Sequence, residues 1–82
     1  MLGNFISHIE GLEGLQFLQE LVLDHNRIKR ISQGSLAGQS GLQTLHLEKN
    51  HIRELNGLKP LVKLQKLFLQ FNRIQVQNIF VN

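Results

Sequence analysis

The 82-residue chain contains no cysteine, tryptophan or tyrosine, and only one proline. Without cysteine it has neither a disulfide framework nor a Cys-based zinc site. No apolar run approaches the length of about 18 residues that a membrane-spanning helix needs, so no membrane insertion is expected. The N-terminus lacks the charged and apolar regions of a signal peptide. The net charge of +3 is too small to indicate a nucleic-acid-binding tail. The length allows one small domain.

Leucine is the residue present in excess, at 16 of the 82 positions. It recurs in the pattern L-x-x-L-x-L-x-x-N-x-I, which is complete at residues 18–28, 42–52 and 64–74. The end of a partial fourth copy is formed by Met1, Asn4 and Ile6. Self-similarity at a fixed period indicates a repeat architecture, in which each unit buries its apolar side against the next.

Within each copy the central leucines alternate with other residues, as in Leu45-His46-Leu47. This two-residue period predicts a short strand with one buried face. Elsewhere leucines recur every three residues, which fits 3₁₀ turns better than an α-helix because three residues fall short of a full α-helical turn. We therefore expect stacked coils whose short parallel strands form one curved, concave sheet, with 3₁₀ or irregular segments on the convex side.

The pattern resembles the leucine-rich-repeat superfamily, whose marked positions are matched by Leu42, Leu45, Leu47, Asn50 and Ile52. The spacing of the leucines is similar to the 22-residue class found in phosphatase regulatory subunits and axonemal dynein light chains. The first complete copy also resembles a large cilium-associated leucine-rich-repeat protein. The resemblance implies an α/β leucine-rich-repeat solenoid of about three and a half coils and an intracellular location, cytoplasmic or ciliary.

We expect a single leucine-rich-repeat domain over residues 1–82. It comprises a partial coil at 1–9, coils near 18–28, 42–52 and 64–74, and an atypical tail at 75–82. In the tail, Gln77 stands where the pattern requires an apolar residue. We interpret the chain as a piece of a longer array or as an alternative ending, and we expect self-association through its uncapped ends.

The connections between copies carry their own signals. Residues 31–42 are longer than the other connection and rich in Gly and Ser, which predicts a looser segment with one helical turn around Leu36. Pro60 is expected at the first position of a short helical turn. Asn56-Gly57 is expected at a corner on the convex side.

An asparagine follows each predicted strand, at Asn26, Asn50 and Asn72. We expect these side chains to point inward, because an amide can both donate to and accept from the backbone of a turning loop. None is followed two residues later by Ser or Thr, so none is a glycosylation site.

The strand alternation also sorts the variable positions. Side chains beside the strand leucines are expected to face outward on the concave sheet, in columns about 4.8 Å apart. Apolar and aromatic residues flanked by charges are typical of a protein-binding surface, and the alternative is ordinary sheet surface covered by a neighbouring segment. The predicted partner-binding residues are Glu20, Val22, Asp24, His25, Thr44, His46, Glu48, Lys49, Lys66, Phe68, Gln70 and Phe71.

The histidines offer an alternative kind of site, a metal or catalytic centre. His25 and His46 lie near Asp24 and Glu48 on adjacent coils, a combination that can bind a metal ion. The two histidines fall in different columns, however, and no short metal-binding motif or accompanying nucleophile is present. We therefore predict no catalytic residue, no metal and no cofactor.

A basic stripe follows the asparagines. Few aromatic residues for base stacking are interleaved with it, so the pattern argues against a nucleic-acid partner and favours a solvated edge. Its residues are Arg27, Lys29, Arg30, His51, Arg53 and Arg73.

The sequence thus favours a non-catalytic protein–protein interaction module that binds a protein partner through the concave sheet. The alternative is a structural segment or truncated product of a larger leucine-rich-repeat scaffold, without independent activity.

Overall fold

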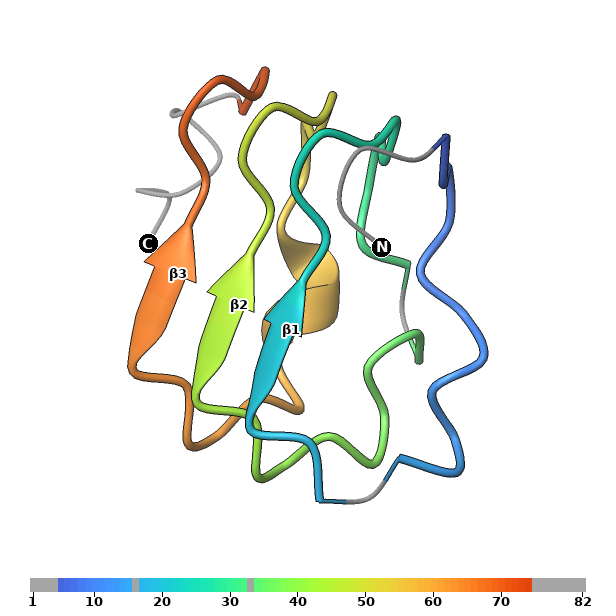
Figure 1. Cartoon of the computed structure of the whole chain (residues 1–82), viewed down its shortest axis with the longest axis vertical. Coiled ribbons are helices and arrows are strands. Elements are labelled where there is room, and N and C mark those ends of the chain that lie inside the picture. Colours follow the sequence, from blue (N-terminus) through green and yellow to red (C-terminus); the bar gives the residue numbers. More distant parts are fainter. Residues whose placement is uncertain (1–4, 16, 33, 75–82) are drawn as a thin grey trace.

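The computed structural model describes residues 5–15, 17–32 and 34–74. Three strands, β1 (Glu20–Val22), β2 (Thr44–His46) and β3 (Lys66–Phe68), form one parallel sheet in the order β1-β2-β3 (Figure 1). The short parallel strands confirm the prediction from the alternating leucines.

Where the return segments are described, they contain one regular element, the 3₁₀ helix η1 (Asn56–Leu58). No α-helix occurs in the described part of the chain, so the helical half of the expected α/β class is not found there. The predictions for Met1, Asn4 and the tail from residue 75 lie outside the described residues.

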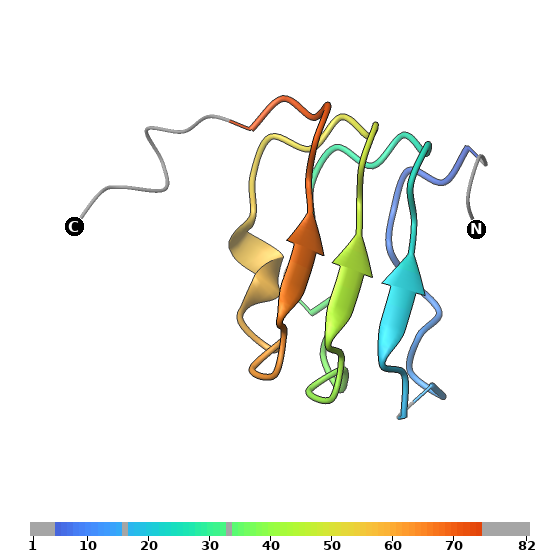
Figure 2. The same cartoon turned by 60° about the vertical axis from the view of Figure 1, so that its left-hand side comes forward.

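The register of the sheet follows directly from the repeat. Leu21, Leu45 and Leu67 stand side by side at the strand centres. Because side chains alternate along a strand, these leucines point to one face and their neighbours to the other. Parallel strands need a crossover connection, which each repeat supplies as a return segment behind the sheet (Figure 2).

The core lies between the sheet and the return segments. In the middle repeat Leu42, Leu45, Leu47 and Ile52 are all 0% exposed. Their equivalents in the third repeat are only partly buried, namely Leu64, Leu67, Leu69 and Ile74. The middle repeat is buried more fully because it lies between the other two, as the strand order β1-β2-β3 shows.

One leucine of the first return segment, where apolar residues recur every three positions, does not lie in the core. Ile9 and Leu12 are buried, whereas Leu15 is 49% exposed. The backbone turns at this point, with the Leu15 amide donating to the Leu12 carbonyl at 3.0 Å, and a turn breaks the three-residue stripe.

The connection at residues 31–42 is described except for residue 33. Its described residues form turns on both sides of Leu36, in one of which the Ala37 amide donates to the Gly34 carbonyl at 3.2 Å. Leu36 is completely buried at its centre. Gln39 is 1% exposed, and its Nε2 donates to the Leu12 carbonyl at 3.0 Å. The longer connection therefore anchors the first two repeats to each other.

Asn56-Gly57 begins η1 and is not a simple corner, and Pro60 follows this helix where we expected it to start one. Gly57 is buried because the backbone of the preceding repeat passes close to it. A Cβ atom at Gly57 would lie 2.5 Å from Ile31 Cγ2, 2.5 Å from the Ile31 carbonyl oxygen and 2.8 Å from that of Ser32.

Replacing Gly57 by alanine is expected to lower the free energy of unfolding by about 1–3 kcal/mol, the usual cost of overpacking. Two of the three atoms in the way belong to backbone, which cannot rotate aside. Urea unfolding checks the change. Gly41→Ala is the matched control, because nothing lies within 4 Å of its Cβ position and its φ is not in the left-handed region. Equal midpoints for the two variants would contradict the close approach.

Candidate protein-binding face

The asparagines hold the loops that end the strands. Asn50 Oδ1 accepts from the Ile28 amide at 3.1 Å, and its Nδ2 donates to the carbonyls of Leu23 at 3.0 Å and Leu47 at 3.1 Å. Asn26 and Asn72 make equivalent bonds, both to the loop of their own repeat and to the repeat that precedes it. These asparagines are inward and structural, as predicted, and they fix where the sheet face ends.

The residue before each asparagine adopts a left-handed backbone conformation. The φ angles are +60° at His25, +59° at Lys49 and +64° at Phe71. Sequence reasoning missed this feature because none of the three is glycine, the residue that usually marks such a position. The signal that could have indicated these left-handed residues is their position, because each directly precedes a repeated asparagine.

The outward residues of the strands form the predicted columns. Val22 pairs in register with His46, and His46 with Phe68, while Glu20 pairs with Thr44, and Thr44 with Lys66. Parallel strands lie about 4.8 Å apart, so each column is a continuous strip of side chains. Asp24, Glu48 and Gln70 occupy equivalent positions beyond the strand ends, and His25, Lys49 and Phe71 occupy the left-handed turns.

His46 is held between its two neighbouring strands. Its Nε2 lies 2.7 Å from Glu20 Oε2, an ion pair when the imidazole is protonated and a hydrogen bond when it is neutral. On the other side its ring stacks on Phe68, with 4.7 Å between the centroids and 9° between the planes. The row Glu20–His46–Phe68 therefore crosses all three strands, and sequence reasoning found its members but not these contacts.

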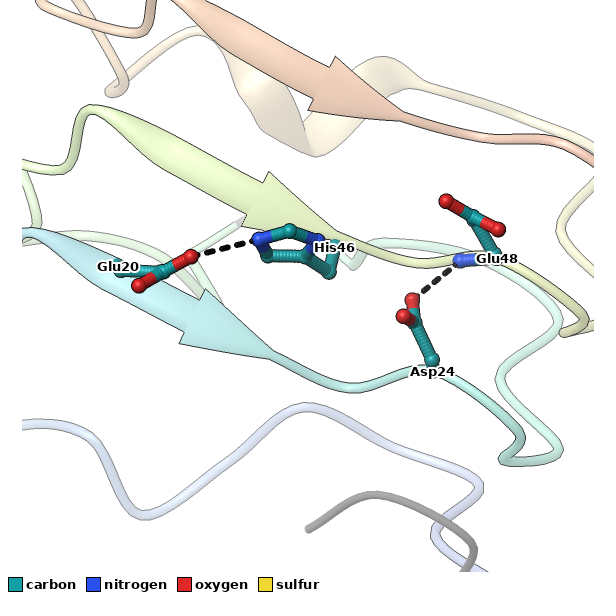
Figure 3. A network of polar contacts seen from close by, with 4 residues as sticks. All are labelled: Glu20, Asp24, His46 and Glu48. Atoms are coloured by element: carbon teal, nitrogen blue, oxygen red, sulfur yellow. Dashed lines mark hydrogen bonds and ion pairs between the residues drawn. The ribbon is translucent and has the colours of Figure 1, made fainter.

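A second contact lies beyond the carboxyl ends of β1 and β2. Asp24 Oδ1 accepts from the Glu48 backbone amide at 2.7 Å. Figure 3 shows the Asp24 carboxylate turned to the Glu48 backbone, and the Glu20 carboxylate turned to the His46 ring. The Lys49 ammonium lies 5.8 Å from the centroid of the Phe71 ring. The face therefore combines aromatic side chains with acidic groups at both ends of the strands.

Comparison with known proteins places this geometry in a family. The model of the family described as "Leucine rich repeat" matches residues 16–74, which include all three strands. The chain belongs to the leucine-rich-repeat family. The repeated leucines and asparagines in the matched range form the leucine core and the asparagine-bonded loops described above, and they align the parallel strands.

Three proteins with different names are similar in sequence to this leucine-rich-repeat chain. Asporin of Bos taurus is 37% identical over 70 residues, covering 84% of this chain and 19% of asporin. A probable U2 small nuclear ribonucleoprotein A' of Drosophila melanogaster is 38% identical over 64 residues, covering 78% and 24%. A protein phosphatase 1 regulatory inhibitor subunit PPP1R7 homolog of Arabidopsis thaliana is 32% identical over 77 residues, covering 93% and 23%.

The chain thus spans about a quarter or less of the length of these leucine-rich-repeat relatives. No solved structure matches it significantly.

The described residues of this leucine-rich-repeat chain do not form a cluster of possible metal ligands around His25 and His46. No group of three or more His, Asp or Glu side chains gathers there in a way that could bind a metal ion. His46 is engaged by Glu20 and Phe68, and His25 lies in a turn outside that row. The described segments also contain no helix that is long and apolar enough to cross a membrane.

Proposed function

We propose that this leucine-rich-repeat chain is a non-catalytic protein-interaction module that binds a protein partner through the exposed face of its sheet. The single observation that carries the proposal is the stacked pair His46–Phe68 on that face. The pair places two aromatic side chains side by side on β2 and β3, and aromatic residues are frequent anchors of protein interfaces.

The surroundings of the pair support a protein partner. Val22, next to His46 in register, is 36% exposed, and Phe71 is 74% exposed. Glu20 and Asp24 lie along β1, and Lys66 begins β3 on the opposite edge of the sheet. An apolar centre with charged sides is the ordinary composition of an interface core and rim. The proposed binding residues are the twelve predicted from the strand alternation.

The wider architecture is part of the same proposal. We propose one domain over residues 1–82, a solenoid of about three and a half coils whose concave side is the sheet face. The names of two relatives, a ribonucleoprotein component and a phosphatase regulatory subunit, support a role in protein assemblies. The resemblance to intracellular members of the family supports a cytoplasmic or ciliary location.

The low share of each relative that the chain covers favours a second candidate, a structural segment of a larger scaffold without its own partner. The partly buried leucines of the third repeat fit this candidate, and they also fit self-association of the isolated chain. Both candidates predict an intact fold, so binding decides between them.

The proposal is tested by replacing Phe68 with alanine. Loss of an anchor typically weakens binding by about 2 kcal/mol, or roughly 30-fold. Affinity capture with quantitative mass spectrometry compares the wild-type chain, Phe68→Ala and Val62→Ala as baits. Val62 is the matched control because it is apolar, 76% exposed and located on a return segment. We expect proteins retained by wild type and Val62→Ala to be lost with Phe68→Ala.

Two results contradict the binding face. If Phe68→Ala unfolds the chain as strongly as a core substitution does, Phe68 belongs to the core. If Phe68→Ala and Val62→Ala both retain every protein that the wild-type chain captures, the sheet face has no partner and the scaffold candidate holds. Repeating the capture at higher salt concentration distinguishes a nucleic-acid partner from a protein partner, because binding to nucleic acid weakens steeply as the salt concentration rises.

A further inference from the structure

A groove lies away from the sheet face, along the segments that follow the repeated asparagines. It has a volume of about 720 Å³, within the range of small-ligand sites. None of its lining residues belongs to β1, β2 or β3. They are Ser7, His8, Lys29, Arg30, His51, Arg53, Glu54 and Arg73.

The fold builds this groove by stacking equivalent backbone segments. The Arg53 amide donates to the Lys29 carbonyl at 3.0 Å, and the Arg73 amide donates to the Ile52 carbonyl at 2.9 Å. Arg30 and Glu54 form an isolated parallel bridge between the same segments. Segments paired in this way lie about 4.8 Å apart, so Arg53 lies beside Lys29, and Arg73 lies beside His51 on the next segment.

The groove concentrates the charge of the molecule. Four Lys or Arg residues and one Glu line it, whereas the other five Lys or Arg residues are balanced by five Asp or Glu. The formal net charge of +3 is therefore located at this one site. Among the described residues, none of the four cations forms an ion pair, and all four side chains are exposed. They are free to bind a ligand.

The composition of the groove points to a compact oxyanion rather than a polymer. The eight lining residues include two histidines but no Phe, Tyr or Trp, so the groove lacks the large aromatic side chains on which nucleic-acid bases stack most strongly. Glu54 interrupts the positive charge and disfavours a continuous phosphate backbone. Guanidinium groups instead favour bidentate binding of individual phosphate groups, and three guanidinium groups are available from three repeats.

We propose that this groove binds a compact anion carrying several closely spaced phosphate groups. Arg30, Arg53 and Arg73 hold phosphate oxygens from successive repeats, and Lys29 contributes a further charge. The site acts independently of any partner on the sheet face, because the two share no residue. The source of the anion is either a soluble polyphosphate or the headgroup of a phosphorylated lipid.

Calorimetric titration of the whole chain with inorganic tripolyphosphate at physiological salt tests the proposal. We expect saturable binding with one site per chain. Arg53→Gln should weaken it roughly tenfold or more, since a charge-assisted bond to an oxyanion is lost, and Arg53→Lys should restore part of the loss. Lys63→Gln removes the same charge from an exposed position outside the groove and should leave the affinity within about twofold. Unfolding midpoints confirm that the variants fold.

A second experiment identifies whether the anion is a soluble polyphosphate or a lipid headgroup. Phosphatidylcholine vesicles containing a bisphosphorylated phosphatidylinositol are sedimented with the chain, with and without tripolyphosphate. Binding that tripolyphosphate displaces indicates a lipid headgroup, and absence of vesicle binding indicates a soluble anion.

The proposal is wrong if tripolyphosphate does not saturate the chain, or if Lys63→Gln and Arg53→Gln weaken binding equally. It is also wrong if a single-stranded oligonucleotide or a phosphoserine peptide displaces tripolyphosphate at lower phosphate concentration. That result would identify a polymer as the ligand.

Discussion

Replacing Leu45 by alanine is expected to lower the free energy of unfolding by about 2–5 kcal/mol. Leu45 is 0% exposed at the centre of β2, with Leu21 and Leu67 in register on either side. The substitution removes buried methyl groups and leaves a cavity that the flanking strands hold open. A chain of this length has a total stability of roughly 4–12 kcal/mol, so the variant loses a large fraction of it. Urea unfolding followed by circular dichroism measures the change.

Leu67→Ala is the matched control for Leu45. The residue type, the position in the repeat and the side of the sheet are identical, but Leu67 is only partly buried. Its truncation should therefore cost clearly less than that of Leu45. If the two variants unfold at the same urea concentration, the third repeat is covered as fully as the second.

Replacing Asn50 by leucine is also expected to lower the free energy of unfolding strongly, on the order of 2–4 kcal/mol. The substitution keeps the branched shape of the side chain but removes the acceptor for the Ile28 amide and the donors to the loop carbonyls. The carbonyls of Leu23 and Leu47 keep other donors, from Asn26 and Asn72 respectively. The buried Ile28 amide loses the acceptor that Asn50 supplies, and stranding such a group accounts for about 1–3 kcal/mol of the total.

The asparagine series offers an internal comparison. Asn72→Leu removes an equivalent set of bonds, but Asn72 is half-buried, so water can replace part of what is lost. Thermal or urea midpoints should rank the wild type first, then Asn72→Leu, then Asn50→Leu. An unchanged midpoint for Asn50→Leu would show that the asparagine series is dispensable.

The strands and their register were predictable because they depend on periodicity alone. Leucines two residues apart fix which face of a strand is buried, and a repeated pattern aligns Leu21, Leu45 and Leu67 with one another. The inward asparagines were predictable for a related reason, since a buried loop needs both donors and acceptors. These features repeat, and repetition makes a weak local signal reliable.

The irregular features were not predictable from the pattern. Leu15 looks like its neighbours in sequence, but a backbone turn places it in solvent. Gln39 sits in a polar, glycine-rich stretch, yet tertiary packing buries it against the carbonyl of Leu12. Both outcomes depend on which segment lies behind the residue, and this information belongs to the assembled repeats.

The candidate sites divide in the same way. The strand alternation predicted the column Val22, His46 and Phe68, because columns are a property of the backbone. It did not predict the stacking of His46 on Phe68 or the contact with Glu20, because both depend on side-chain rotamers. The basic stripe was visible in the sequence, but its closure into a groove with Ser7 and His8 required the stacked coils.

The asparagine bonds run in one direction along the molecule. Asn26 accepts from Ile6, Asn50 from Ile28 and Asn72 from Ile52, so each amide completes the loop of the repeat that precedes it. A repeat therefore depends on its successor in the chain for part of its own hydrogen bonding. Arrays built in this way have a polarity: losing a repeat from the carboxyl side leaves the preceding loop unsatisfied, whereas losing one from the amino side removes a loop together with its bonds. During synthesis, each coil is then completed only after the next asparagine has left the ribosome.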